Sequence, residues 1–153
     1  MGLSTCYLTC VPSGTLMPLP TGPTLISREV QHLNRRLIQM TQTEEKYHSM
    51  YNHCKLRFLE LLDKKLTHSV VNENGQKLII SLKIGDKSEF KLNFDTDESY
   101  ELEISGHQDE MQAKIVAANY FGARHAFETL LNLMVVDELT NYLVVIGIVV
   151  VNN

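Results

Sequence analysis

The sequence predicts an α+β domain, in which a mostly antiparallel β-sheet carries two main helices packed on one face. Two observations predict it. Apolar residues recur at helical spacing in segments 43–66 and 121–135, which is typical of amphipathic helices. Around these segments, apolar and polar residues alternate in short runs, which indicates strands with one buried and one solvated face. The short connections between the runs favour antiparallel neighbours.

The bulk composition fits one soluble globular domain. The chain has 153 residues, of which 44% are hydrophobic and 21% charged, and its net charge is -4. This length supports a single hydrophobic core. The acidic balance argues against a nucleic-acid partner, which requires a basic face. The longest apolar run, Leu143–Val151, is far shorter than the ~20 residues of a membrane-spanning helix. The first ten residues lack the basic start and apolar core of a signal peptide.

The N-terminal part combines an arm, a strand and the first helix. Residues 1–24 contain all four prolines and are interpreted as an extended arm. Residues 30–40 mix apolar and basic side chains and predict a strand. Thr41 and Glu44 have the spacing of a capping box. We therefore expect the first helix to cover residues 43–66.

The rest of the chain predicts strands around a second helix. The expected strands between the two helices are Leu78–Ile84, Phe90–Phe94, Tyr100–Ile104 and Lys114–Ala118. After the helix at 121–135, the β-branched run Leu143–Val151 predicts one final buried strand. This run is uncharged and apolar on both faces, so we expect it to promote self-association of the isolated domain.

No group of side chains has the pattern of an active site. His48 and His53 lie on different faces of the first helix, and His125 lacks the second histidine of a zinc-binding helix. The acidic residues between 95 and 98 lack the glycine and the later glutamate of a calcium loop. We interpret them as solvated residues of a turn. We therefore expect no metal, no cofactor and no catalytic residue.

Three cysteines leave at least one thiol unpaired within the chain. They are Cys6, Cys10 and Cys54, and the sequence does not decide their pairing. Cys54 lies on the apolar stripe of the first helix, where a buried and inert thiol is expected.

Three ordered stretches resemble the animal, especially insect, beta-N-acetylhexosaminidases of glycoside hydrolase family 20. The strongest, Ile115–Leu130, is similar to the family's Gly-Ala-Arg-His-Gly-x-Glu-Thr-Leu helix and the strand before it. The second, Asp97–Ile104, resembles the preceding strand. The third is the cysteine pair followed by Leu16–Gly22, whereas residues 40–90 match only in pattern. The motif residues shared with the family are Asp97, Glu98, Tyr100, Gly122, Ala123, Arg124, His125, Glu128 and Thr129.

The resemblance implies the N-terminal, non-catalytic domain of such an enzyme, here residues 25–153. In the family a (β/α)8 barrel follows and carries a His-x-Gly-x-Asp-Glu run. Its Glu is the general acid and its Asp orients the substrate's attacking acetamido group. This sequence contains no such run and no tryptophan to line a sugar pocket. We expect the catalytic barrel to be absent, the chain to be truncated at both ends, and the motif residues to be structural rather than substrate-binding.

The family pattern is not matched everywhere. Ala126 stands where the family has glycine, Met17 where it has tryptophan and Leu19 where it has lysine. The glycine change alters how closely the helix can approach its neighbour.

The implied parent enzyme removes terminal N-acetylglucosamine or N-acetylgalactosamine from chitooligosaccharides or glycans. The implied partner is its catalytic barrel. The domain would therefore contact a glycan substrate only as part of the parent enzyme. A homodimer is also possible. Members are secreted, lysosomal or membrane-associated, and the sequence does not place this chain. The alternative is a free-standing protein-interaction or sugar-binding module without catalysis.

Overall fold

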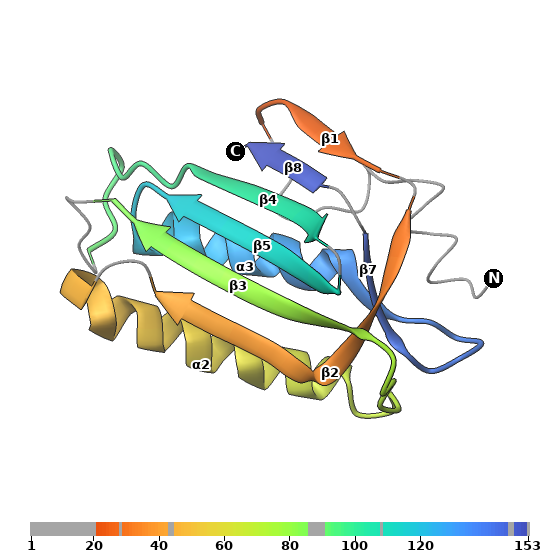
Figure 1. Ribbon diagram of the computed structural model, residues 1–153. Helices are drawn as coiled ribbons and strands as arrows, with labels where there is room; N and C mark the ends of the chain where they lie inside the picture. Colours follow the sequence, from red (N-terminus) through yellow and green to blue (C-terminus); the bar gives the residue numbers. More distant parts are fainter. Residues whose placement is uncertain are drawn as a thin grey trace.

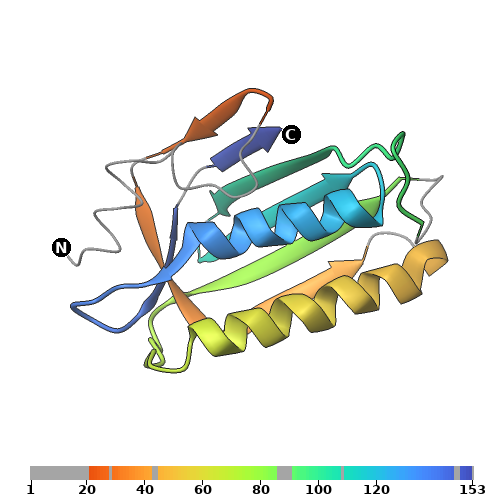
Figure 2. The same cartoon turned by 180° about the vertical axis from the view of Figure 1, so that it is seen from behind.

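The computed structural model describes residues 21–27, 29–42, 45–85, 91–107, 109–146 and 149–152. They form one twisted β-sheet (Figures 1 and 2). Two helices lie side by side on one of its two faces. The elements in chain order are β1 (Thr24–Ile26), β2 (Val30–Gln42), the 3-10 turn η1 (Glu45–Tyr47), α2 (His48–Lys65), β3 (Gln76–Ile84), β4 (Tyr100–His107), β5 (Glu110–Ala117), α3 (Tyr120–Leu133), β6 (Met134–Val136), β7 (Leu143–Ile146) and β8 (Val149–Asn152). The predicted α+β class is confirmed.

The sheet is mixed, with the order β1-β8-β4-β5-β3-β2-β7-β6. Strand β3 runs parallel to both β2 and β5, and the other neighbouring pairs are antiparallel. The predicted antiparallel pairing is therefore correct for most of the sheet and wrong for β3. A parallel neighbour requires a long crossover, and α2 supplies one between β2 and β3.

The predicted strand Phe90–Phe94 is wrong for the residues that the structure describes, since 91–99 contain no strand. The Asn93 side chain is the physical reason. Its Oδ1 accepts hydrogen bonds from the Asp95 amide at 3.0 Å and the Thr96 hydroxyl at 3.0 Å. Such local bonds compete with a strand ladder and close a turn instead.

The predicted single strand Leu143–Val151 is also wrong, because this run forms two strands in different parts of the sheet. Strand β7 lies between β2 and β6, whereas β8 lies between β1 and β4. Both strands have neighbours on each side, and Leu143 and Val151 are fully buried. Both strands are thus paired along both edges, and the self-association expected from this run stays a prediction.

The core lies between the sheet and the helices. Helix α2 buries the predicted stripe, and α3 buries a broader one that faces β4 and β5. The predicted capping box is wrong. Helix α2 begins only at His48 after Tyr47, with no side-chain cap, and Thr41 belongs to β2, where its hydroxyl reaches the Ile80 carbonyl. No described helix is long and apolar enough to cross a membrane.

Candidate functional site

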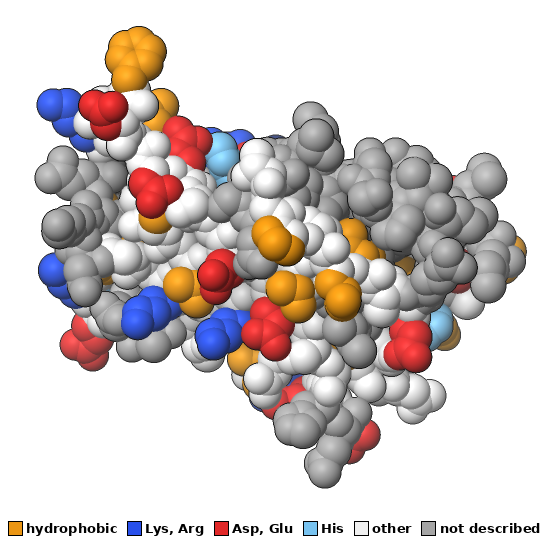
Figure 3. All heavy atoms as spheres, turned by 90° about the horizontal axis from the view of Figure 1, so that it is seen from above, with side chains coloured by type: hydrophobic (Ala, Val, Ile, Leu, Met, Phe, Trp, Pro, Cys, Tyr) orange, Lys and Arg blue, Asp and Glu red, His pale blue; other side chains and the backbone are white. Residues whose placement is uncertain are grey.

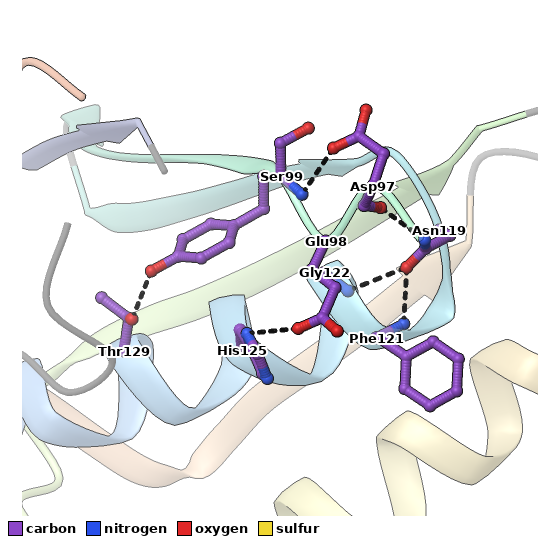
Figure 4. Close-up of polar contacts among 9 residues, drawn as sticks. Asp97, Glu98, Ser99, Asn119, Phe121, Gly122, His125 and Thr129 are labelled. Carbon is purple, nitrogen blue, oxygen red and sulfur yellow. Dashed lines mark hydrogen bonds and ion pairs between the residues drawn. The ribbon is translucent and has the colours of Figure 1, made fainter. Parts of the chain in front are cut away.

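Most of the shared motif residues meet at one junction, where the segment leading into β4 contacts the first turns of α3 (Figure 4). Asn119 is the N-cap of α3 and organises this junction. Its Oδ1 accepts hydrogen bonds from the amides of Phe121 at 2.8 Å and Gly122 at 3.1 Å. Its Nδ2 donates to the Asp97 carbonyl. One side chain therefore satisfies two amides at the start of the helix and ties the helix to the loop.

Gly122 lets the backbone of α3 touch this loop directly. A Cβ atom at Gly122 would lie 2.5 Å from the Ser99 carbonyl oxygen and 2.8 Å from that of Glu98. Both distances are shorter than real contacts of a Cβ atom, and the atoms met are backbone. A glycine is needed here for close approach.

Two further contacts continue the junction along α3. His125 Nδ1 lies 3.6 Å from Glu98 Oε2, and both side chains are about one-third exposed. One turn later, the Tyr100 and Thr129 hydroxyls form a 2.7 Å hydrogen bond inside the core. Burial raises the pKa of Tyr100, so this phenol stays protonated and acts as a hydrogen-bonding group. Residues from loop, strand and helix are thus locked together at successive turns.

The carboxylates of Asp97 and Glu98 turn toward different partners. Figure 4 shows them pointing in different directions, Asp97 toward Ser99 and Glu98 toward His125. Asp97 accepts a 2.9 Å hydrogen bond from the Ser99 amide. Hydrogen bonding from Ser99 lowers the pKa of Asp97, which keeps it ionised as an acceptor. Each of the two carboxyls thus has its own neighbour within the domain.

Of the remaining motif residues, Arg124 and Glu128 lie beside helix α2. Ala123 is fully buried, and the Arg124 guanidinium lies 5.9 Å from the centre of the Tyr120 ring. Glu128 pairs with Arg57 of α2 at 3.6 Å. This side of α3 joins the two helices.

Sequence reasoning missed several residues of this site, chiefly Asn119, Ser99 and Tyr120. The Tyr120 hydroxyl lies 2.5 Å from His53 Nδ1 of α2. Asn119 carried a usable signal, since asparagine before a helix is a preferred N-cap. Ser99 contributes its backbone amide and carbonyl as well as a side-chain hydrogen bond to Asp97, and no local sequence pattern marks these contacts.

Cys54 is a buried thiol, as predicted. It is packed on the inner face of α2, and burial raises its pKa to about 12, although the nearby Arg124 charge acts in the opposite direction. A thiol with such a pKa holds almost no thiolate near neutral pH, so it is a poor nucleophile. Cys6 and Cys10 lie outside the described residues.

We expect Cys54 to resist alkylation in the folded chain. At about pH 8 its thiolate fraction is lower than that of an ordinary cysteine by roughly a thousandfold, so iodoacetamide should modify it at least that much more slowly than in urea. Peptide mass spectrometry over time measures the rate, with the same chain in urea as control. Equal rates in the folded and unfolded chain would contradict the burial of this thiol.

The described residues offer little else for chemistry. They contain no cluster of His, Cys, Asp or Glu suited to a metal ion. An open hollow of about 450 Å³ lies at the end of the sheet where β3 and β5 finish and β4 begins. It is lined by Thr21, Gly22, Gly85, Ser99, Tyr100, Glu101, Val116, Ala117 and Ala118. Among the described residues of this lining, Glu101 is the one carboxyl.

Comparison with known proteins identifies the fold and the family. A family model described as "beta-acetyl hexosaminidase like" matches residues 16–133. The chain is 27% identical over 149 residues to the chitooligosaccharidolytic beta-N-acetylglucosaminidase of Bombyx mori, and 26% identical over 149 residues to that of Ostrinia furnacalis. Each match covers 95% of this chain and 25% of the relative, so the chain spans about a quarter of these proteins.

Solved structures share the fold. The exo beta-N-acetylglucosaminidase of Vibrio harveyi, a glycoside hydrolase family 20 protein, superposes with a TM-score of 0.61 at 20% identity, over 92% of this chain and 19% of that chain. The Flavobacterium johnsoniae chitobiase superposes with a TM-score of 0.59 at 21% identity, over 91% of this chain and 20% of that chain. With the match over residues 16–133, these findings show that the chain belongs to the beta-acetyl hexosaminidase-like family, within glycoside hydrolase family 20.

Proposed function

We propose that this chain is the accessory, non-catalytic domain of a beta-N-acetylhexosaminidase. The observation that carries the proposal is the junction of Figure 4, where the family's shared residues hold α3 against the segment entering β4. Residues that contact one another within the domain make it rigid, and they are then not available to bind a substrate. The names of the Bombyx mori and Ostrinia furnacalis relatives, which are about four times longer, support the same enzyme class.

The proposed parent reaction is retaining, substrate-assisted hydrolysis of terminal N-acetylglucosamine or N-acetylgalactosamine residues. That reaction requires a general acid and a group that orients the acetamido oxygen. Within the described residues, the adjacent acids Asp97 and Glu98 are committed to Ser99 and His125. We therefore assign catalysis to a separate barrel domain, with residues 25–153 as its rigid support. Residues 1–20 of the expected arm lie outside the described residues.

We expect the purified chain to show no turnover of a chromogenic N-acetylglucosaminide. The adjacent acids Asp97 and Glu98 point toward Ser99 and His125 rather than toward a common site. Release of the chromophore is compared with a no-protein control and with the Glu98→Gln variant. Turnover that survives repurification and falls in the variant would refute the non-catalytic assignment.

A free-standing sugar-binding module is the less favoured alternative. Sugar sites combine a few polar groups with an apolar or aromatic surface. Tyr100 is the aromatic residue in the lining of the hollow, and its hydroxyl is already bonded to Thr129 in the core. Among the residues that the structure describes, this lining therefore offers no exposed aromatic ring on which a pyranose could stack.

A further inference from the structure

The connection between α2 and β3 ends in a tight turn over residues 72–75, directly before β3 begins (Figure 1). The Gly75 amide donates a hydrogen bond to the Asn72 carbonyl at 3.0 Å, and the Asn74 amide donates to Asn72 Oδ1 at 3.1 Å. The two central residues, Glu73 and Asn74, are exposed. The turn therefore presents the Asn74 side chain to water, next to a glycine nitrogen.

The packing of the turn on β2 requires glycine at position 75. A Cβ atom there would lie 2.5 Å from the Asn34 nitrogen and 2.7 Å from the Leu33 carbonyl oxygen, and both are backbone atoms. Leu33 is fully buried, and it pairs with Gln76 where β2 and β3 first meet. Because no side chain fits at this position, Asn74 is followed by the residue that shields it least.

An asparagine followed by glycine is chemically the most labile of asparagines. Asparagine is a thermolabile residue, because the next backbone nitrogen can attack its side-chain carbonyl, and a glycine leaves that nitrogen unhindered. Asn74 is the one asparagine of the sequence with glycine after it. In the part of the chain that the structure describes, no hydrogen bond engages the Asn74 carboxamide. The reacting groups are thus adjacent, and the electrophilic one is free.

We propose that Asn74 is a site of spontaneous deamidation in the folded chain, with water as the co-reactant. The Gly75 nitrogen attacks Cγ of Asn74, and its proton leaves with the side-chain NH2 group as ammonia. Water then opens the cyclic succinimide. Cleavage of the bond between the nitrogen and Cγ gives aspartate, whereas cleavage of the bond between the nitrogen and the backbone carbonyl carbon of residue 74 gives isoaspartate. The proposal does not depend on the enzymatic role proposed for the domain.

The hydrogen bond from Gly75 to Asn72 sets the rate of this reaction. It must open before the nitrogen can attack, so the folded chain reacts more slowly than the unfolded chain. The turn is exposed and irregular, and such segments open locally without unfolding the core. Deamidation therefore proceeds in the native state.

The two products have different consequences for the sheet. Isoaspartate inserts the Cβ atom of residue 74 into the main chain directly before Gly75, where the contacts with Leu33 and Asn34 leave no room. Aspartate leaves the backbone unchanged and adds one charge beside Glu73, whose exposed carboxylate lies 3.1 Å from Arg36. Figure 3 shows acidic and basic side chains adjacent on another face of the molecule. Such exposed charges contribute little to stability, so the harmful product is isoaspartate.

Peptide mass spectrometry of the full chain, aged folded in mildly alkaline buffer, tests the reaction. The tryptic peptide from Leu66 to Lys77 should convert with time into two products in which OH replaces the NH2 of Asn74. Asn72 lies in the same peptide before Glu73, so it is an internal control and should remain intact. Asn74→Gln should stop the conversion, because its longer side chain closes a ring less readily. A sample aged in urea gives the rate in the unfolded chain.

Urea unfolding of the separated products tests the structural consequence. The isoaspartyl chain should have an unfolding equilibrium constant raised by roughly tenfold to a hundredfold, as expected for an extra atom in a packed site. Freshly purified Asn74→Asp is the matched control, since it carries the same charge without the extra main-chain atom. It should change the constant by less than about threefold.

The possible results are distinct. Conversion of Asn74 alone, with a less stable isoaspartyl product, supports the proposal. An Asn74 that converts in urea but stays intact in the folded chain, or an Asn72 that converts equally fast, would overturn the assignment of the site. An isoaspartyl chain as stable as Asn74→Asp would overturn the consequence drawn from the close packing of Gly75.

Discussion

Replacing Gly122 by alanine is expected to lower the free energy of unfolding by about 2–3 kcal/mol. The added Cβ would lie 2.5 Å from the Ser99 carbonyl oxygen, and neither partner can move easily. Ser99 is held by the Ala118 amide, and Gly122 by the Asn119 cap. Helix propensity alone predicts the opposite sign, a gain of about 1 kcal/mol for alanine over glycine. The sign of the measured change in unfolding free energy therefore shows whether the close contact with Ser99 or helix propensity dominates at this position.

Gly106→Ala is the matched control for this substitution. A Cβ there would lie 3.1 Å from Sδ of the flexible Met111 side chain, which needs to shift by only a few tenths of an ångström. Urea unfolding of both variants gives the comparison. A Gly122→Ala chain as stable as the wild type would show that the helix and the loop separate without cost, and the proposed role of the junction would fail.

Replacing Phe58 by alanine is expected to cost about 3–5 kcal/mol of unfolding free energy. Phe58 is 1% exposed at the centre of α2, and its ring lies 5.1 Å from the ring of Phe127 on α3. Truncation would open a cavity between both helices and the sheet. Because small domains are stable by only about 5–15 kcal/mol, this change should leave the chain marginally folded.

Leu56→Ala gives the matched control two residues away. Leu56 is 68% exposed on the outer side of α2, so its loss should change stability by less than about 0.5 kcal/mol. Thermal melts of the two variants measure the difference. Similar melting temperatures would mean that α2 is not packed on the sheet as described.

The elements that the sequence predicted well are those governed by local pattern. The alternation from Leu78 to Ile84 and the apolar stripe of α2 arise from burial against one neighbouring layer, and both are confirmed. The failures concern pairing between distant segments. The run Leu143–Val151 is apolar throughout, but the division into β7 and β8 depends on β1, β2, β4 and β6. No local pattern encodes those partners. At Phe90–Phe94 the alternation was misleading because Asn93 forms turn bonds instead.

For the candidate site, too, individual residues could be identified from the sequence, whereas their contacts could not. Resemblance picked out Gly122, His125 and Glu98, but the sequence did not show that they touch. The contact between the α3 backbone and the Ser99 carbonyl is a tertiary contact, and no local sequence pattern predicts it. Asn119 was within reach of local reasoning and was missed because the helix was expected to begin at residue 121.

A domain replacement tests most directly whether this chain supports a hexosaminidase. The matching segment of the Bombyx mori relative, about a quarter of that protein, is exchanged for this chain. Calorimetry and hydrolysis of a chromogenic N-acetylglucosaminide are then measured on the soluble product. The account predicts an active chimera that unfolds in one cooperative transition, and a Gly122→Ala chimera that loses stability and activity together. A soluble chimera whose inserted domain melts separately, at the temperature of the isolated chain, would contradict it.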